Sequence, residues 1–215
     1  MGYRIKVGTR SSRLALAQVD EIQTELKGIS FEVVTIETKG DKDKETSLSL
    51  RENSDFFTYE IEQALLNKQV DIAIHSAKDL EDSPPPELEI IALTMSLSPF
   101  DCLVSQGNLT LDTLPNLSKV GTSSQNRKNS LIKYRNDLII KDIRGNIDER
   151  LAQLDRGEFE AVIVAQAALM RLGYKKRISQ VISSKIIKPH ILQGRLAVQI
   201  RKDRDDLREI FAKIR

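Results

Sequence analysis

The feature that most constrains the fold is one short segment that nearly repeats in two distant parts of the chain. Residues 6–12 read KVGTRSS and residues 119–124 read KVGTSS, so the second copy is one residue shorter. Each copy has the pattern of a strand, a Gly-Thr turn with serines, and then a helix. A second strand–loop–helix pattern follows each copy at a similar distance. The repeat predicts two related α/β units rather than one domain.

The whole chain alternates short apolar runs with helical stripes, which implies a parallel or mixed sheet with helices on its faces. Strands are predicted at 4–8, 31–38, 71–74, 88–93, 102–105, 119–121, 138–143, 161–165 and 196–200. The polar segment 39–55 is predicted to be a long mobile loop or lid. The expected fold class is α/β, with two lobes that resemble solute-binding proteins of the periplasmic type II class and a cleft between them. The first lobe is expected at 1–97 plus 191–215 and the second at 98–190.

Composition excludes several classes of function. The 215 residues carry a net charge of +2 and no tryptophan, so nucleic-acid binding is not expected. No apolar run has the length of a membrane span and no signal peptide pattern opens the chain, which favours a cytoplasmic protein. With two histidines and one cysteine far apart in sequence, neither a disulfide nor a metal site is expected.

The stretch 70–86, VDIAIHSAKDLEDSPPP, holds the first candidate site residues. An apolar run at 72–74 predicts a buried strand, and Lys78 and Asp79 follow it on the loop at its carboxyl end. Ligands bind at that end of the strands in open α/β sheets. The alternative is an ordinary solvated loop pair.

Other polar side chains stand at predicted strand ends or on the helices that follow. They are Arg10, Ser12, Thr122, Ser123, Ser124, Arg127, Arg144, Arg150 and Arg171. Arginine forks and helix amino termini both bind carboxylates or phosphates, so we expect a polyanionic ligand. Singly, each arginine could be a surface residue, and the serines could be helix caps. Asp79 is a lone carboxylate among these cations; it could stabilise a cationic intermediate or form a structural ion pair.

These residues fall in stretches that match one family in order along the chain. Among the matching stretches are KVGTRSSRLALAQ (6–18), FFTYEIEQALL (56–66), DIAIHSAKDL (71–80), VGTSSQNRK (120–128), IRGNIDERLAQLDRG (143–157) and QGRLAVQIR (193–201). The combination resembles porphobilinogen deaminase, also called hydroxymethylbilane synthase.

The resemblance implies a cytoplasmic transferase of haem and other tetrapyrrole biosynthesis. Such an enzyme joins four porphobilinogen molecules head to tail, releasing ammonia each time, through oligopyrrole intermediates. Asp79 matches the catalytic aspartate, and Phe57 an aromatic residue near the substrate. Thr122, Ser123 and Ser124 match the turn that binds the dipyrromethane cofactor. Gln193 and Gly194, which open another matching stretch, are also expected to bind substrate or cofactor. The positions that match carboxylate-binding residues are Arg10, Ser12, Lys78, Arg127, Arg144, Arg150 and Arg171.

One departure from the family bears on the cofactor. The family has a third domain after the QGRLAVQIR strand, with the cysteine that holds dipyrromethane covalently, and we expect this chain to lack it. Cys102, in the predicted strand 102–105, is not that cysteine. The cofactor is therefore expected to be non-covalent or absent, or a separate chain supplies the third domain to an otherwise monomeric protein. A second hypothesis is a non-catalytic protein that binds a tetrapyrrole or another polycarboxylate. A hydrolase using Ser76 and Lys78 is a weaker third, since no oxyanion-hole signature accompanies them.

Overall fold

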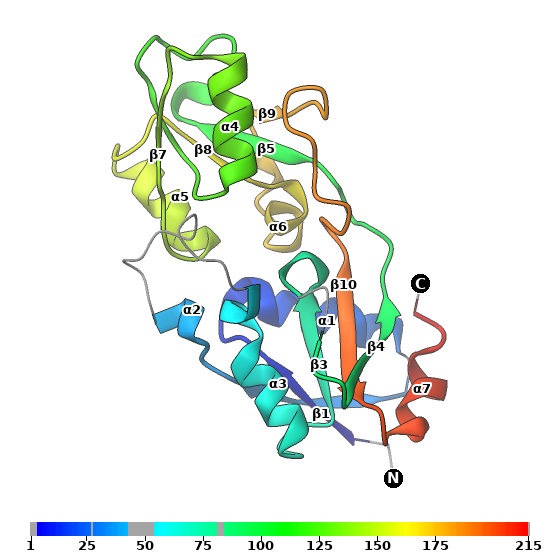
Figure 1. The fold of residues 1–215 in the computed structure, drawn as a ribbon. Coiled ribbons are helices and arrows are strands. Elements are labelled where there is room, and N and C mark those ends of the chain that lie inside the picture. Colours follow the sequence, from blue (N-terminus) through cyan, green and yellow to red (C-terminus); the bar gives the residue numbers. More distant parts are fainter. Residues whose placement is uncertain (1–3, 27, 43–53, 81–83, 215) are drawn as a thin grey trace. The chain divides into compact units, whose positions relative to one another are not determined.

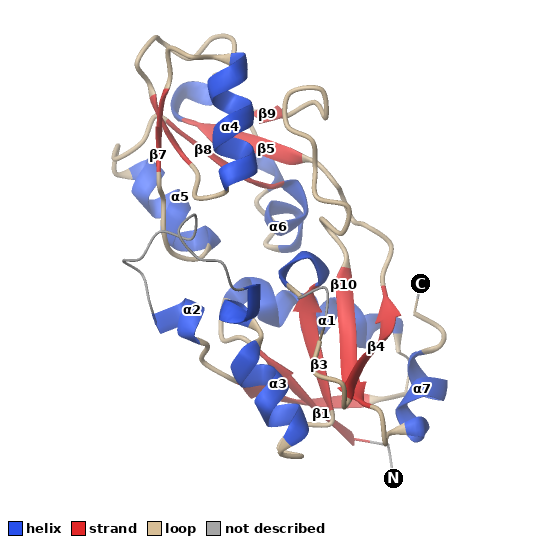
Figure 2. Cartoon of the chain, viewed as in Figure 1, coloured by secondary structure: helices blue, strands red, loops and turns tan. Residues whose placement is uncertain are grey.

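The protein folds into two α/β units, each built on its own five-stranded sheet (Figures 1 and 2). The structure is a computed structural model that describes residues 4–26, 28–42, 54–80 and 84–214. The first unit holds the described residues of 1–97 and 195–214, and the second holds 98–194. Among the residues described, no helix combines the length and the apolar character needed to cross a membrane.

The first unit has a mixed sheet in the order β2-β1-β3-β10-β4. Its strands are β1 (Arg4–Thr9), β2 (Ser30–Thr35), β3 (Ile72–Ser76), β4 (Leu88–Leu93) and β10 (Leu196–Arg201). β1 runs parallel to β2 and β3, whereas β10 lies antiparallel between β3 and β4. The carboxyl ends of β1, β2, β3 and β4 and the amino end of β10 therefore meet at one edge of the sheet.

Helices cover both faces of this sheet. They are α1 (Arg13–Glu25), α3 (Tyr59–Leu66) and α7 (Asp205–Phe211), and the unit also holds the short helix α2 (Lys39–Lys42), which has no buried residue. Side chains alternate along β3, so Ile72 and Ile74 pack with α1 and α7, whereas Ala73 packs with α3 on the other face. Because Ser12 accepts a hydrogen bond from Ala15 N, α1 begins directly after the first Gly-Thr turn.

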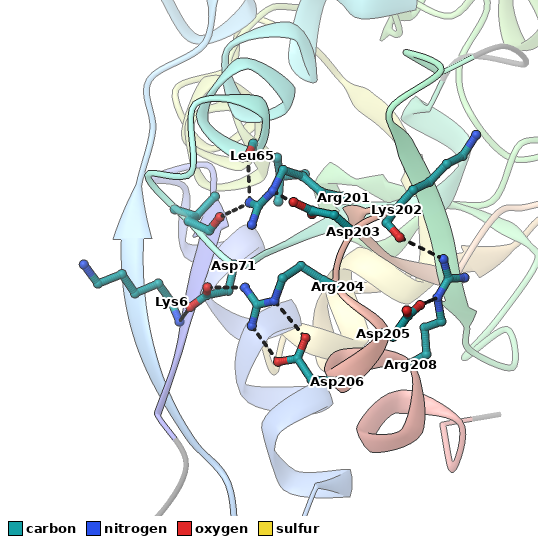
Figure 3. Close-up of polar contacts among 11 residues, drawn as sticks. Lys6, Leu65, Asp71, Arg201, Lys202, Asp203, Arg204, Asp205, Asp206 and Arg208 are labelled. Atoms are coloured by element: carbon teal, nitrogen blue, oxygen red, sulfur yellow. Dashed lines mark hydrogen bonds and ion pairs between the residues drawn. The ribbon is translucent and has the colours of Figure 1, made fainter.

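The end of the sheet away from that edge is held by arginines at the end of β10 and just after it (Figure 3). Arg201 donates to the carbonyl oxygens of Leu65 and Val70 at 2.9 and 3.3 Å, which ties the end of α3 to β10. Arg204 contacts Asp71 at 2.6 Å, just before β3 begins. These contacts fasten the last segment of the chain to the first unit.

The second unit repeats this arrangement, with strand order β7-β6-β8-β5-β9. Its strands are β5 (Asp101–Ser105), β6 (Lys119–Gly121), β7 (Ile139–Lys141), β8 (Ala161–Ala165) and β9 (Gln180–Val181), and its helices are α4 (Gln125–Tyr134), α5 (Ile147–Asp155) and α6 (Gln166–Arg171). β6 is parallel to β7 and β8, and β5 is antiparallel to β8. In both units, then, the strand at the fourth position of the sheet, β10 or β5, runs antiparallel to its neighbours.

The predicted α/β class with two units is confirmed, and the structure differs from the expectations in detail. Residues 39–42, expected in a loop, form α2, because Asp41 N and Lys42 N bond to Thr38 O. Residues 43–53 of that predicted loop lie outside the described residues, and its last two residues begin a 3-10 helix, Ser54–Phe57. The two-residue strand β9 had no recognisable pattern. The chain returns to the first unit after Gly194, four residues later than expected, because Gln193 bonds to Pro99 and Asp101.

Candidate functional site

Lys78 and Asp79 lie where the sequence placed them, at the carboxyl end of β3. They belong to a 3-10 helix, Ala77–Asp79, and both are half-buried. This turn is anchored on two sides. Ala77 N donates to Arg195 O at 3.0 Å, and the Oγ of Ser76 accepts a 2.9 Å bond from Gln18 on α1. The turn that carries Asp79 is therefore bonded on one side to the residue before β10 and on the other to α1.

A buried polar network includes His75 of β3, four residues before Asp79, on the face of the sheet covered by α3. His75 Nε2 is 3.0 Å from Gln199 Oε1, and Gln199 Nε2 donates to Glu62 Oε1 at 2.8 Å. Since the Gln199 amide nitrogen faces Glu62, its oxygen faces His75, and the His75 proton is on Nε2. Burial lowers the pKa of His75 to about 4, opposed by the hydrogen bond with Gln199 and the charge of Asp79. His75 is therefore neutral near pH 7.

Arg10, at the same edge, is paired within the first unit. Its Nε lies 3.1 and 3.2 Å from the two carboxylate oxygens of Asp41, and its Nη2 lies 2.5 Å from one of them. The pKa of Asp41 lies below its usual value: burial raises it, but the bonds and charge of Arg10 and the bonds from Thr38 outweigh burial. A ligand carboxylate at Arg10 would have to compete with Asp41.

Phe57 completes this cluster. Its ring centroid lies 4.3 Å from the guanidinium carbon of Arg10. A Cβ at position 40 would lie 2.1 Å from the Phe57 ring, so Gly40 is the residue that allows the ring this close to α2. The cation–π contact and the Asp41 pair together fix the direction of Arg10.

The second Gly-Thr turn uses its hydroxyls inside the fold. Ser123 Oγ donates to Ile143 O at 2.6 Å and accepts from Ile143 N at 3.1 Å. Thr122 Oγ1 accepts from Ser124 N, and Ser124 caps α4, as Ser12 caps α1. Thr122 and Ser123 are buried. These side chains hold the turn, so their predicted contacts with a cofactor stay predictions.

Arg127 departs most from its expected role. We predicted that it binds ligand carboxylates, but its side chain is only 11% exposed, and its Nε and Nη2 bond to Asp101 at 3.0 and 2.6 Å. Gln193 donates to the same carboxylate at 2.8 Å. The fork of Arg127 is occupied within the second unit, and we assign it a structural role.

The other three arginines follow β7 and β8 and are half-buried. Arg144 lies three residues after Lys141, the last residue of β7. Arg150 lies on α5 and donates from Nε to Gly145 O at 2.8 Å. Arg171 ends α6 and donates from Nη2 to Gly194 O at 2.9 Å, where the positive φ of Gly194 turns the chain toward β10. Their guanidinium groups match the carboxylates of a polyanion.

Cys102 does not fit as an attachment point for a cofactor. It lies in β5 with no exposed surface, and its thiol faces Val164 O at 3.5 Å. Burial, with the nearby charge of Asp101, raises the pKa of the thiol to about 12. In the described parts of the chain, no three His, Cys, Asp or Glu side chains are grouped as metal ligands would be.

Several residues of this site were not predicted from the sequence. Asp41 and Gln18 gave no signal, because each acts through a partner more than 30 residues away. Gln199 lies in an apolar strand, and its polarity was the only hint of a buried network. Arg195 was not predicted, because it precedes its strand, whereas the predicted basic residues follow strands or lie on the helices after them.

Comparison with known proteins agrees with this arrangement. Residues 5–209 match the family model described as porphobilinogen deaminase, dipyromethane cofactor binding domain. A porphobilinogen deaminase of Natranaerobius thermophilus is 42% identical over 97% of this chain and 69% of its own length. One from Deinococcus radiodurans is 43% identical over 94% and 68%. The chain thus spans about two thirds of the length of these relatives.

Solved structures show the same fold at low identity. An ancestral arginine-binding protein bound to arginine superposes with a TM-score of 0.52 at 17% identity, covering 99% of this chain and 90% of that one. That likeness concerns the fold alone. The family model and the relatives, which cover nearly the whole chain, place it more narrowly: the chain belongs to the porphobilinogen deaminase family.

Proposed function

We propose that this chain is a hydroxymethylbilane synthase, which condenses four porphobilinogen molecules head to tail with loss of ammonia. Family membership supports the reaction. The observation that carries it is the position of Asp79, on a turn anchored by β10 and α1 and above a neutral histidine. A carboxylate fixed in this way is suited to a reaction in which positive charge develops on a pyrrole.

The chemistry follows from these groups. When ammonia leaves the aminomethyl carbon of porphobilinogen, the C–N bond breaks and the pyrrole becomes an azafulvene-type cation. Asp79 stabilises that cation. The α-carbon of the growing chain then attacks the methylene carbon, and the ring proton at that α-carbon is lost. The fixed carboxylate favours each step without reorganising, because its turn is held before substrate arrives.

Cationic groups orient the substrate's acidic side chains. We propose that Lys78, Arg144, Arg150 and Arg171 bind acetate and propionate groups, and that Arg10 does so by exchanging Asp41 for a ligand carboxylate. These residues would also hold dipyrromethane, whose carboxylates match the same forks; when bound, it supplies the pyrrole to which the first substrate is added. Because Cys102 is buried, we propose that it does not attach this group.

The test is turnover by the purified chain. Porphobilinogen loss and, after oxidation, porphyrin absorbance are followed for the unaltered protein, for Asp79→Asn and for a matched control, Asp20→Asn, at an exposed position of α1. We expect Asp79→Asn to lower kcat by roughly 10²- to 10³-fold, while porphobilinogen binding changes little and the control keeps full activity. Undiminished turnover by Asp79→Asn would refute the carboxylate mechanism.

A second function is favoured by one observation, the complete burial of the chain's single cysteine. On that basis the chain could hold a tetrapyrrole or another polycarboxylate without catalysis. The same assay separates the two. Binding of porphobilinogen by folded protein that consumes none of it, even with added dipyrromethane, supports the binding protein and contradicts the synthase.

A further inference from the structure

Arg195 lies beside the turn that carries Asp79. In the β3–β10 pairing, Leu196 is opposite Ser76 and Ala197 is opposite His75. The bond from Ala77 N to Arg195 O continues this pairing by one position, so Arg195 is opposite Ala77. β10 is antiparallel to β3, and this edge therefore joins the residue before β10 to the residues after β3. Arg195 belongs to the edge that also holds Arg10, Lys78 and Asp79.

The side chain of Arg195 has a donor that the fold does not use. Its Nε is shielded from solvent, and among the residues described it has no hydrogen-bond partner. The contrast with other arginines of the first unit is clear, since Arg201 and Arg204 both donate from Nε to aspartates. A shielded donor without an acceptor is costly, and such groups in native proteins call for an explanation. A ligand that brings a hydrogen-bond acceptor to this nitrogen would explain the unused donor.

The acceptor that fits is a carboxylate. The guanidinium group offers donors in a planar fork that a carboxylate can meet with two parallel bonds. A ligand with several acidic groups near Asp79 would be repelled by that carboxylate, and a cation one strand away offsets the repulsion. We propose that Arg195 binds a carboxylate substituent of the ligand whose reacting carbon is at Asp79. The choice of a carboxylated pyrrole as ligand rests on the proposed function.

The experiment compares Arg195→Met, which keeps the length of the side chain but removes the fork, with Arg195→Lys, which keeps the charge. The control is Arg4→Met, at the far end of β1, where the side chain is 68% exposed. Binding of porphobilinogen is measured by calorimetric titration, and KM and kcat by turnover. We expect Arg195→Met to raise Kd and KM by roughly ten- to a hundredfold with kcat nearly unchanged, and Arg195→Lys to lie between.

Thermal unfolding of the unliganded variants separates binding from a structural role. Because the shielded Nε has no partner, Arg195→Met should melt at the same temperature as the unaltered protein or higher. Affinity equal to that of Arg4→Met overturns the proposal, and so does a lower melting temperature for Arg195→Met accompanied by weaker binding.

Ligand variants identify the group that Arg195 contacts. The monomethyl esters of porphobilinogen each lack one carboxylate. For the ester that lacks the contacted group, Arg195→Met and the unaltered protein should bind with equal affinity. If Arg195→Met weakens the binding of both esters as much as it weakens the binding of porphobilinogen, the proposal is overturned. If the unaltered protein does not bind porphobilinogen, the proposed function fails. Titration with benzenehexacarboxylate then tests the contact with Arg195. Weaker binding by Arg195→Met than by the other proteins supports the contact, and equal binding by all variants overturns it.

Discussion

Acidification should destabilise the first unit through His75. Burial lowers the pKa of His75 to about 4, whereas the ordinary value, expected in the unfolded chain, is 6.5. Between these values the unfolded chain binds a proton that the folded chain does not. Lowering the pH through this window therefore favours unfolding, and the loss is complete below pH 4.

The size of the effect follows from the two pKa values. They differ by about 2.5, and each pKa unit corresponds to about 1.4 kcal/mol, so the full loss is about 3 kcal/mol. Between pH 7 and pH 5 it amounts to about 2 kcal/mol. Asp41, whose pKa lies below its usual value, contributes stability that is lost only under more acidic conditions, as the pH falls through 3.8 and below.

The measurement is urea unfolding at pH 7, 6 and 5 for three proteins. His75→Gln keeps an amide N–H that can reach Gln199 but cannot be protonated, and it should lose about 2 kcal/mol less than the unaltered protein between pH 7 and 5. His190→Gln removes the other histidine, which is exposed, and should behave as the unaltered protein. Equal pH dependence in all three proteins would show that His75 is not a buried neutral group.

Three further predictions concern single contacts. Arg127→Lys should lower the free energy of unfolding by about 3 kcal/mol in a denaturant titration, because the buried Asp101 loses a two-bond partner; a change below 1 kcal/mol would place the pair at the surface instead. Gly40→Ala should cost about 1–3 kcal/mol and shift thermal unfolding, since its Cβ would meet the ring of Phe57 at 2.1 Å; an unchanged melting temperature would contradict that packing. Cys102 should stay unmodified by iodoacetamide in native protein and react after denaturation, as mass spectrometry can show; rapid native labelling would disprove its burial.

Local patterns predicted the elements that depend on local physics. The largely apolar segments at β4 and β8 matched their strand boundaries, since β8 is an uninterrupted apolar run and β4 is interrupted only by Glu89. The α5 helix begins directly after its N-cap, Asn146, whose capping box with Glu149 can be read from four residues. β9 could not be predicted, since two residues hold no period and only pairing with β5 makes them a strand.

The candidate site was predicted in its residue types but not in its pairings. An arginine after a strand has the same appearance in a sequence whether its fork is occupied or available. Arg127 and Arg10 both appeared suited to a ligand, and only the fold showed Asp101 and Asp41 on their forks. Distant partners of this kind are set by the tertiary arrangement, on which the pattern around the arginine carries no information.

Strand direction explains why Arg195 was not predicted from the sequence. In a parallel sheet the site residues all follow their strands, and a search at strand ends finds them. Here β10 enters antiparallel after the chain has completed the second unit, so the residue that precedes it lies at the same edge as Asp79. In the first unit, the residue before the antiparallel strand is Arg195. In the second unit, Asp101 is the first residue of the antiparallel strand β5, and it lies on the fork of Arg127. The reversed strand thus brings Arg195 to the site edge of the first sheet and Asp101 to the corresponding edge of the second sheet.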